Sequence, residues 1–462
     1  MISLRFECTG HWPVHFFRKA RVAAALLLAA APVSGLAAAV DAAVTRPQQP
    51  PVAGQGIADF YRLRNNAPLW LSPGAGDSAQ QLISLLSSAN LDGLYPDKYH
   101  VADLQKAIDA ARDGKKKAVE KAEQQLSDAF VSYVGDLVRD PNIGIIYVDP
   151  QLRPKPPSPL AALLNAAAAP SLGDYLRNLG WMHPYYAELR HALANHQYAD
   201  EHQRQLLTLN LERARALPAG KHRYVVVNAA QQRLYMFEDG RVVDSMVVVV
   251  GKPKYPTPLI TAYIRFASLN PYWFVPPDLA AERIAPNVLK RGLRYLDNLG
   301  YQVLSDWDEN PTIIDPKTID WKAVADGKVE VRIRQLPGPH NSMGRMKFMF
   351  PNEAGVYLHD NPERELFTEA SRLYSGGCVR LEDASRLGRW LFGQDLDWES
   401  AGTEQRVPIP RLVPVYITYL TALPSDDGSQ IAYYDDVYGR DAARLAATSS
   451  SNATAGASIG NH

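Results

Sequence analysis

Two residues of types that together could perform nucleophilic acyl transfer lie near each other in the sequence. His359 ends the strand-like run VYLHD, and Cys378 follows two glycines in YSGGCVRL. A cysteine nucleophile needs a base that accepts its proton and donors that stabilise the oxyanion formed on the attacked carbonyl. His359 could be the base. Gly376 and Gly377 could adopt backbone angles closed to other residues and direct amide groups toward one point.

Each of these features also has an ordinary structural explanation. A lone cysteine is most often a small buried apolar residue, and glycine pairs often only form turns. The segment LEDASRLGRWLF, directly after the cysteine, predicts a helix with Leu387 and Leu391 on one face. Glu382 or Asp383 would cap this helix. Its N-terminus would favour the thiolate form of Cys378.

The N-terminal segment has the pattern of an export signal. A basic stretch precedes the apolar run of residues 22–36, and alanines occupy residues 37–39. This order predicts a cleaved signal in residues 1–39. An uncleaved membrane anchor is the alternative, because the weakly apolar region continues to residue 43. The apolar run is nevertheless short for a span, which needs about 20 residues.

The number and positions of the cysteines also support a reactive role for Cys378. The chain has two cysteines, Cys8 and Cys378, and Cys8 precedes the apolar run of the signal. After cleavage Cys378 would be the single thiol of an exported domain. An unpaired cysteine in an oxidising compartment has no disulfide role within its own chain, so it is a reactive thiol or an intermolecular partner.

Composition excludes several other functions. Lys plus Arg and Asp plus Glu both number 49 in 462 residues, so the formal net charge is zero. This balance argues against a nucleic-acid partner bound through bulk positive charge. No His/Cys cluster has metal-ligand spacing, so neither a metal nor an organic cofactor is expected.

The chain divides into segments of different character, which together predict an α+β protein. A mainly helical region precedes a β-rich region, and the latter contains a partly helical insertion. The predicted segments are a signal or anchor (1–39), a linker (40–56), a helical domain (57–218), a β-rich domain (220–422) with an insertion at about 276–345, and a tail whose end is disordered (423–462).

A strand ending in histidine, followed about twenty residues later by SGGCVR, resembles the L,D-transpeptidase catalytic domain of the YkuD type. Other segments resemble the long, Gram-negative periplasmic branch of that family in the same order. They are DFYRLRNNAPLW and HPYYAELRHAL (scaffold), YVVVNAAQQRLYMFEDGRVVDSMVVVVGKP (start of the catalytic domain), NPYWFVPPDLA (cap) and DDVYGRD (C-terminal signature).

The resemblance implies a role for each matching residue. Cys378 corresponds to the nucleophile and His359 to the general base, which the main-chain carbonyl of Asp360 would orient. The remaining matches are the amides of Gly377 and Cys378 (oxyanion hole), Arg380 (shaping the site), and Tyr357 and Ser375 (lining it). Alternatively, Arg380 forms an ion pair with Glu382 or Asp383, and Tyr357 belongs to the core.

Two departures from the family pattern refine this interpretation. Gly376 stands where the broad family usually has a histidine, so His359 is the single candidate base; the long branch lacks that histidine too. The branch often carries a small peptidoglycan-binding module between its scaffold halves. Here ANHQYADEHQRQ joins the halves directly, so the stem peptides must dock by other means.

The reaction implied by the resemblance is acyl transfer between peptidoglycan stem peptides in the periplasm. Cys378 would form a thioester with a tetrapeptide stem, release its terminal D-alanine and pass the acyl group to a diaminopimelate amine, giving a 3-3 cross-link. Carbapenems could acylate the same thiol. Trimming as an L,D-carboxypeptidase, exchange of D-amino acids, attachment of a protein to the wall, and a non-catalytic wall-binding scaffold are alternatives. Other cell-wall synthesis proteins are candidate partners.

Overall fold

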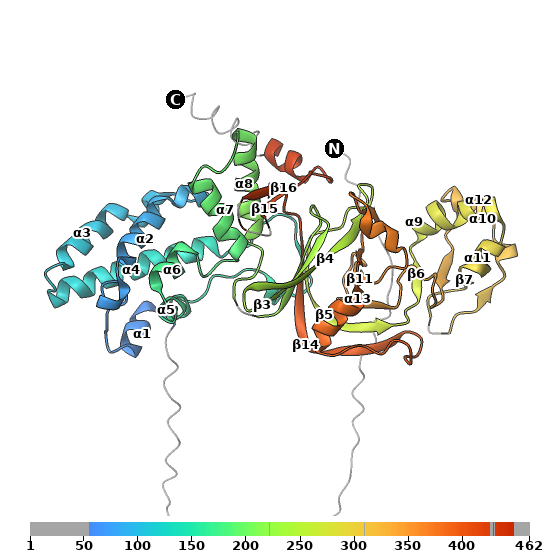
Figure 1. Cartoon of the computed structure of the whole chain (residues 1–462), viewed down its shortest axis with the longest axis horizontal. Helices are drawn as coiled ribbons and strands as arrows, with labels where there is room; N and C mark the ends of the chain where they lie inside the picture. The colour runs from blue at the N-terminus through green and yellow to red at the C-terminus, as the bar shows by residue number, and fades with distance from the viewer. Residues whose placement is uncertain (1–54, 221, 309, 426–427, 429, 448–462) are drawn as a thin grey trace, which may run out of the picture. The chain divides into compact units, whose positions relative to one another are not determined.

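The computed structural model describes residues 55–220, 222–308, 310–425, 428 and 430–447 (Figure 1). The predicted signal or anchor, Cys8, all but the end of the predicted linker, and the last residues of the predicted tail lie outside this part of the chain. Within the described residues, no helix combines the length and apolar character needed to cross a membrane.

Residues 57–214 form the helical scaffold that the sequence predicts. In helix α4 the buried side chains recur at three- and four-residue intervals, for example at Leu126, Phe130, Tyr133 and Leu137, so one face enters the core. The helices are α1 (Ile57–Leu63), α2 (Ser78–Ser87), α3 (Val101–Ala111), α4 (Lys116–Leu137), α5 (Pro159–Ala167), α6 (Leu172–Arg177), α7 (Pro184–Ala194) and α8 (Glu201–Ala214).

The β-rich region closes into a barrel. Strand β14 pairs with both β2 and β5, so the order β5-β10-β11-β13-β4-β3-β2-β14 returns to its start. Short β1 (Ile146–Tyr147) and β12 (Leu373–Ser375) add to β5 and β4. The barrel strands are β2 (Tyr224–Asn228), β3 (Arg233–Glu238), β4 (Arg241–Gly251), β5 (Ile260–Leu269), β10 (Met346–Met349), β11 (Leu358–His359), β13 (Val379–Leu381) and β14 (Gln405–Thr418).

Alternation along the strands separates two cores. Val225 and Val227 of β2 enter the barrel core, whereas Tyr224 and Val226 face a second cluster that includes Leu217. The predicted hairpin turn between β3 and β4 is present, with positive φ at Asp239 (52°) and Gly240 (76°). Helix α13 (Ala384–Phe392) covers the barrel; Leu387 and Leu391 lie on one face of it, as predicted, and that face enters the barrel core.

The insertion between β5 and β10 forms the partly helical cap that the sequence predicts. Its sheet has the order β6-β9-β7-β8, and its helices share one apolar core with that sheet. The elements are β6 (Trp273–Val275), α9 (Pro277–Leu279), a π-helical turn (Ala280–Ile284), α10 (Ala285–Arg291), α11 (Arg294–Asn298), β7 (Tyr301–Leu304), β8 (Ile313–Ile314), α12 (Trp321–Ala325) and β9 (Arg332–Gln335).

The segment after the barrel differs from the predicted tail. Residues 422–424 (β15, Ala422–Pro424) pair with β16 (Ile431–Tyr433), and Ala422 enters the scaffold core. Asp441 is buried and forms an ion pair with Arg213 of α8. The sequence predicts residues 423–462 as a tail with a disordered end, on the composition after Asp441. Before that point the segment is attached, because Val437 and Tyr438 pack against the barrel core and polar contacts add to this packing.

Candidate active site

The candidate catalytic residues come together because β11 and β13 are neighbouring parallel strands. His359 lies directly across from Arg380, and Leu358 lies across from Val379. Leu358 and Val379 are fully buried in the barrel core. Since successive side chains point to opposite faces of a strand, His359 and Arg380 share the other face. Cys378 directly precedes β13 on that side of the barrel.

The backbone orients the imidazole of His359. Its Nδ1 lies 2.6 Å from the carbonyl oxygen of Asp360. A carbonyl can only accept, so Nδ1 carries the proton and Nε2 of the neutral ring has a free lone pair. Burial, together with the positive charge of Arg380, lowers the pKa of His359 to about 3. The ring is therefore a neutral hydrogen-bond acceptor at neutral pH.

Asp360 is itself held in place through its side chain. One carboxylate oxygen accepts the backbone N–H of Arg345 at 2.8 Å, and the other accepts from Arg364 at 2.9 Å. Gly344 makes room for this carboxylate, because a Cβ at that position would lie 2.3 Å from Asp360 Oδ2. The residue whose carbonyl orients His359 is thus held by two neighbouring segments, at Gly344–Arg345 and at Arg364.

Cys378 is the free cysteine among the described residues, and its side chain is half-buried. Its sulfur is closely surrounded by protein, and this burial raises the pKa of the thiol to about 11. Hydrogen bonds from the backbone and hydroxyl of Tyr357, and the charge of Arg380, act in the opposite direction. The thiol lies 3.7 Å from the carbonyl oxygen of Gly355.

The prediction that the N-terminus of the following helix favours the thiolate form of Cys378 is wrong. Helix α13 begins at Ala384, after β13. Asp383, not Glu382, caps it: the Asp383 carboxylate accepts the Arg386 N–H at 2.9 Å. The helix terminus is therefore separated from the thiol by a strand, and desolvation of the sulfur dominates its pKa.

Ser375 shapes the turn before Cys378. Its hydroxyl donates to the Cys378 carbonyl at 2.6 Å and accepts the N–H of Gly377 at 3.1 Å. Gly377 has φ 117°, an angle that glycine adopts readily. Gly376 instead allows a close approach, since a Cβ there would lie 3.2 Å from Leu279 of the cap.

The amides predicted for the oxyanion hole differ in their present partners. The N–H of Gly377 already donates to Ser375, whereas the N–H of Cys378 has no acceptor among the described residues. Tyr357 adds its own backbone N–H and hydroxyl near the sulfur. The donors closest to the thiol are therefore the N–H of Cys378 and the Tyr357 groups that now face the sulfur, whereas the N–H of Gly377 is already bound to Ser375.

Arg380 pairs with neither Glu382 nor Asp383. Its guanidinium donates to Glu363 at 2.8 Å and to Asn361 at 3.4 Å, both in the loop after β11. Glu363 also lies 3.8 Å from Arg283 of the cap. Arg380 is nine-tenths buried. The alternative that Arg380 forms an ion pair is therefore correct, but the predicted partners are wrong, because the guanidinium faces the loop that follows His359.

Tyr357 joins the site to the cap. Its ring packs against both the barrel core and the cap core. It also meets the ring of His359 edge to face, with centroids 5.7 Å apart. Burial, and then the nearby Cys378 sulfur, raises the pKa of Tyr357 well above its ordinary value. Core packing and lining of the site are thus both features of this residue.

An ion pair beside His359, formed by buried Lys347 and partly buried Glu404, could not be predicted from the sequence. Lys347 lies directly across β10–β11 from His359, and its ammonium is 2.9 Å from Glu404. Glu404 also accepts from the Ser268 hydroxyl and the Tyr272 N–H, each at 2.7 Å. Lys347 lowers the pKa of both His359 and Cys378. The alternation of MKFM could have suggested an outward Lys347, but nothing local indicated its partner.

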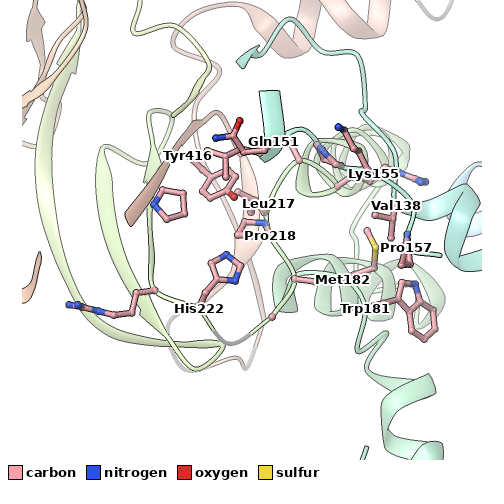
Figure 2. A pocket seen from close by; sticks show the side chains of 18 of the residues that line it. Val138, Gln151, Lys155, Pro157, Trp181, Met182, Leu217, Pro218, His222 and Tyr416 are labelled. Carbon is pink, nitrogen blue, oxygen red and sulfur yellow. The ribbon is translucent and has the colours of Figure 1, made fainter. Parts of the chain in front are cut away.

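A cavity of about 900 Å³ lies away from the thiol, between the helical region and the barrel (Figure 2). Its wall includes Trp181, Met182, His222 and Tyr416. Cys378 and His359 do not line it, so the chemistry described above lies elsewhere. In the described part of the chain, no group of three or more His, Cys, Asp or Glu side chains could hold a metal ion.

Two family models match the chain. Residues 55–193 match the scaffold domain, and residues 222–407 match the L,D-transpeptidase catalytic domain. A Haemophilus influenzae protein with the curated name "Putative L,D-transpeptidase" is 26% identical over 411 residues, which cover 83% of this chain and 78% of that protein.

Two similar solved structures are both L,D-transpeptidases. The Mycobacterium smegmatis enzyme is 15% identical, with a TM-score of 0.21 over 44% of this chain and 60% of that chain, less than two thirds of its length. The Enterococcus faecium catalytic domain is 16% identical, with a TM-score of 0.17 over 43% of this chain and 97% of that chain. The assignment rests on the family models, which place a scaffold domain at residues 55–193 and an L,D-transpeptidase catalytic domain at residues 222–407.

Proposed function

We propose that this protein is a cysteine L,D-transpeptidase that forms 3-3 cross-links between peptidoglycan stem peptides in the periplasm. The observation that supports it most is the oriented, neutral imidazole of His359 on the strand beside the Cys378 segment. Because Nδ1–H is bound to the Asp360 carbonyl, the lone pair of Nε2 is available for a proton from sulfur.

In the acylation step the Cys378 sulfur attacks the carbonyl carbon of the peptide bond before the terminal D-alanine. The thiol proton passes to His359 Nε2, and the oxyanion accepts hydrogen bonds from the Cys378 N–H and from Tyr357. The C–N bond then breaks, and His359 returns the proton to the departing amino group. The products are a thioester and free D-alanine.

In the second step an amine of a neighbouring stem, the diaminopimelate side chain, attacks the thioester carbonyl. His359 accepts a proton from this amine, and the C–S bond breaks as the thiolate is reprotonated. The new amide joins two stems. Water as acceptor would give trimming, and the amine of a D-amino acid or of a protein would give exchange or attachment.

Intact mass spectrometry tests the nucleophile. Imipenem should add its mass to the wild-type chain and leave a Cys378→Ala variant unmodified. A folded wild-type sample without an adduct, or a labelled Cys378→Ala variant, would refute the assignment. Purified tetrapeptide muropeptides then test the reaction. A 3-3 dimer is the expected product, whereas tripeptide monomers alone would show that water is the acceptor.

A further inference from the structure

A loop of residues 251–257, between β4 and β5, supports the segment before the nucleophile. The Thr257 hydroxyl donates to the Gly377 carbonyl at 2.9 Å and accepts the Gly251 N–H at 2.8 Å, in a fully buried position. The Lys252 N–H donates to the Ser375 carbonyl at 3.0 Å. The loop therefore holds the chain on both sides of Gly376, directly before Cys378.

The loop is closed tightly on itself. A Cβ on Gly251 would lie 2.0 Å from the Tyr255 carbonyl oxygen and 2.7 Å from the Thr257 nitrogen. Contacts this close leave no room for a side chain, so the two ends of the loop move together. A shift of either end should consequently change the position of the Thr257 hydroxyl.

A C-terminal turn, residues 436–441, forms hydrogen bonds with both ends of this loop. The Tyr438 hydroxyl donates to the Gly251 carbonyl at 2.6 Å and accepts the Thr257 N–H at 3.4 Å. Arg440 donates to the Thr257 carbonyl at 2.9 Å, with its guanidinium against the rings of Tyr438 and Tyr419. Within the described residues, no side chain of this turn forms a hydrogen bond or an ion pair with the side chain of Cys378.

The turn is rigid for identifiable reasons. The Asp436 carboxylate accepts the backbone N–H groups of Arg440, Asp441 and Ala442 at 2.8, 2.9 and 3.1 Å. It also accepts the Tyr419 hydroxyl of the barrel at 2.8 Å. Asp441 forms a buried ion pair of 2.6 Å with Arg213 of scaffold helix α8. The turn is thus attached to both the barrel and the scaffold.

We propose that this C-terminal turn positions the nucleophile. Tyr438 and Arg440 hold the 251–257 loop in place, and the hydrogen bond from the Thr257 hydroxyl to the Gly377 carbonyl holds the Gly377–Cys378 backbone in place in turn. They are positioning residues that act through the backbone of the Cys378 segment. The inference rests on the proposed function, in which Cys378 attacks the substrate. It gives the C-terminal segment a part in acylation and joins scaffold helix α8 to the nucleophile through Asp441.

Acylation kinetics of the full chain test this role. Thr257→Val removes the bridging hydroxyl, and Thr257→Ser keeps one. Tyr438→Phe removes the two hydrogen bonds that the Tyr438 hydroxyl forms with Gly251 and Thr257. Tyr434→Phe is the matched control, because its hydroxyl accepts from Gln231 and lies outside these contacts to the loop. The readouts are the first-order rate constant of Cys378 acylation at saturating imipenem, the half-saturating imipenem concentration and the melting temperature.

The expected result is a rate constant lowered about 10- to 100-fold in Thr257→Val and Tyr438→Phe, since small misplacements of reacting groups cost this much. The half-saturating concentration should change far less. Thr257→Ser and Tyr434→Phe should acylate like the wild type. If Tyr438→Phe acylates at the wild-type rate, or if Tyr434→Phe loses rate equally, the positioning role is refuted.

Hydrogen exchange separates this inference from the proposed function. The peptide that contains residues 375–378 should exchange faster in Tyr438→Phe than in the wild type or Tyr434→Phe. A wild-type chain that imipenem does not acylate would refute the proposed function, whereas unchanged exchange at residues 375–378 in Tyr438→Phe would refute the positioning inference alone.

Discussion

The rate of Cys378 acylation should depend on pH in a way set by two opposed pKa shifts. Burial raises the pKa of Cys378 to about 11 and lowers the pKa of His359 to about 3. Between these values both groups are neutral, and the proton moves from sulfur to Nε2 during attack. The acylation rate constant should therefore vary less than about threefold from about pH 5.5 to about pH 8.5.

Replacing the base should convert this flat profile into a steep one. A His359→Asn variant keeps an amide donor that can reach the Asp360 carbonyl but cannot accept the thiol proton. Acylation must then use pre-formed thiolate, which is about 1 part in 3000 at about pH 7.5, or 3.5 units below the pKa of the thiol. A loss of about 10²- to 10⁴-fold is expected at that pH, recovering about tenfold per pH unit.

Quenched intact-mass measurements with saturating imipenem give both profiles, and a melting curve for each sample shows that it is folded. An acidic limb with a midpoint near 6.5 in the wild type would mean that His359 keeps an ordinary pKa. A flat pH profile in His359→Asn, whatever the size of its rate constant, would mean that another group removes the thiol proton. Either outcome would refute the neutral-pair reasoning.

Three further changes test the structure around the site. His183 is fully buried with its pKa lowered to about 3, so below about pH 6.5 this residue binds a proton in the unfolded chain but not in the folded one. It should contribute a loss of stability of about 1.4 kcal/mol per pH unit there, and His183→Asn should reduce the slope in urea unfolding by that amount. Gly344→Ala, at φ 62° and with its Cβ against Asp360, should cost about 1–3 kcal/mol and slow acylation; an unchanged melting temperature would contradict this. Arg213→Ala or Asp441→Ala alone should destabilise by about 3–5 kcal/mol in the same assay, and the double variant by less than their sum.

The parts of the fold that the sequence predicted well are those with local causes. Alternating apolar residues and an Asp-Gly turn predicted β2, β3 and β4, and three- and four-residue periodicity predicted the scaffold helices and α13. The proximity of His359 and Cys378 required the pairing of β11 with β13. That pairing joins residues about twenty positions apart, and the family resemblance, more than periodicity, indicated it.

Electrostatics at the site could not be predicted because it depends on distant partners. Arg380 has acidic neighbours two and three positions along the chain, yet strand alternation and pairing aim it at Glu363. The thiol was expected to be acidic from the helix that follows it. Its pKa is raised instead, because packing around the sulfur is a tertiary property that no local pattern contains.

The C-terminal turn of residues 436–441 shows which contacts near the end of the described chain a sequence pattern does not contain. Composition predicts disorder only after Asp441, and residues 435–441 (DDVYGRD) resemble the C-terminal signature of the family. Here polar contacts add to the packing of Val437 and Tyr438 on the barrel core: Asp436 accepts three backbone N–H groups, and Asp441 pairs with Arg213. Buried polar groups are costly when unpaired, so each contact is strongly specified once its partner is present. Those partners lie up to 228 positions away, so the DDVYGRD motif could mark the segment but could not indicate its contacts with the loop behind the nucleophile.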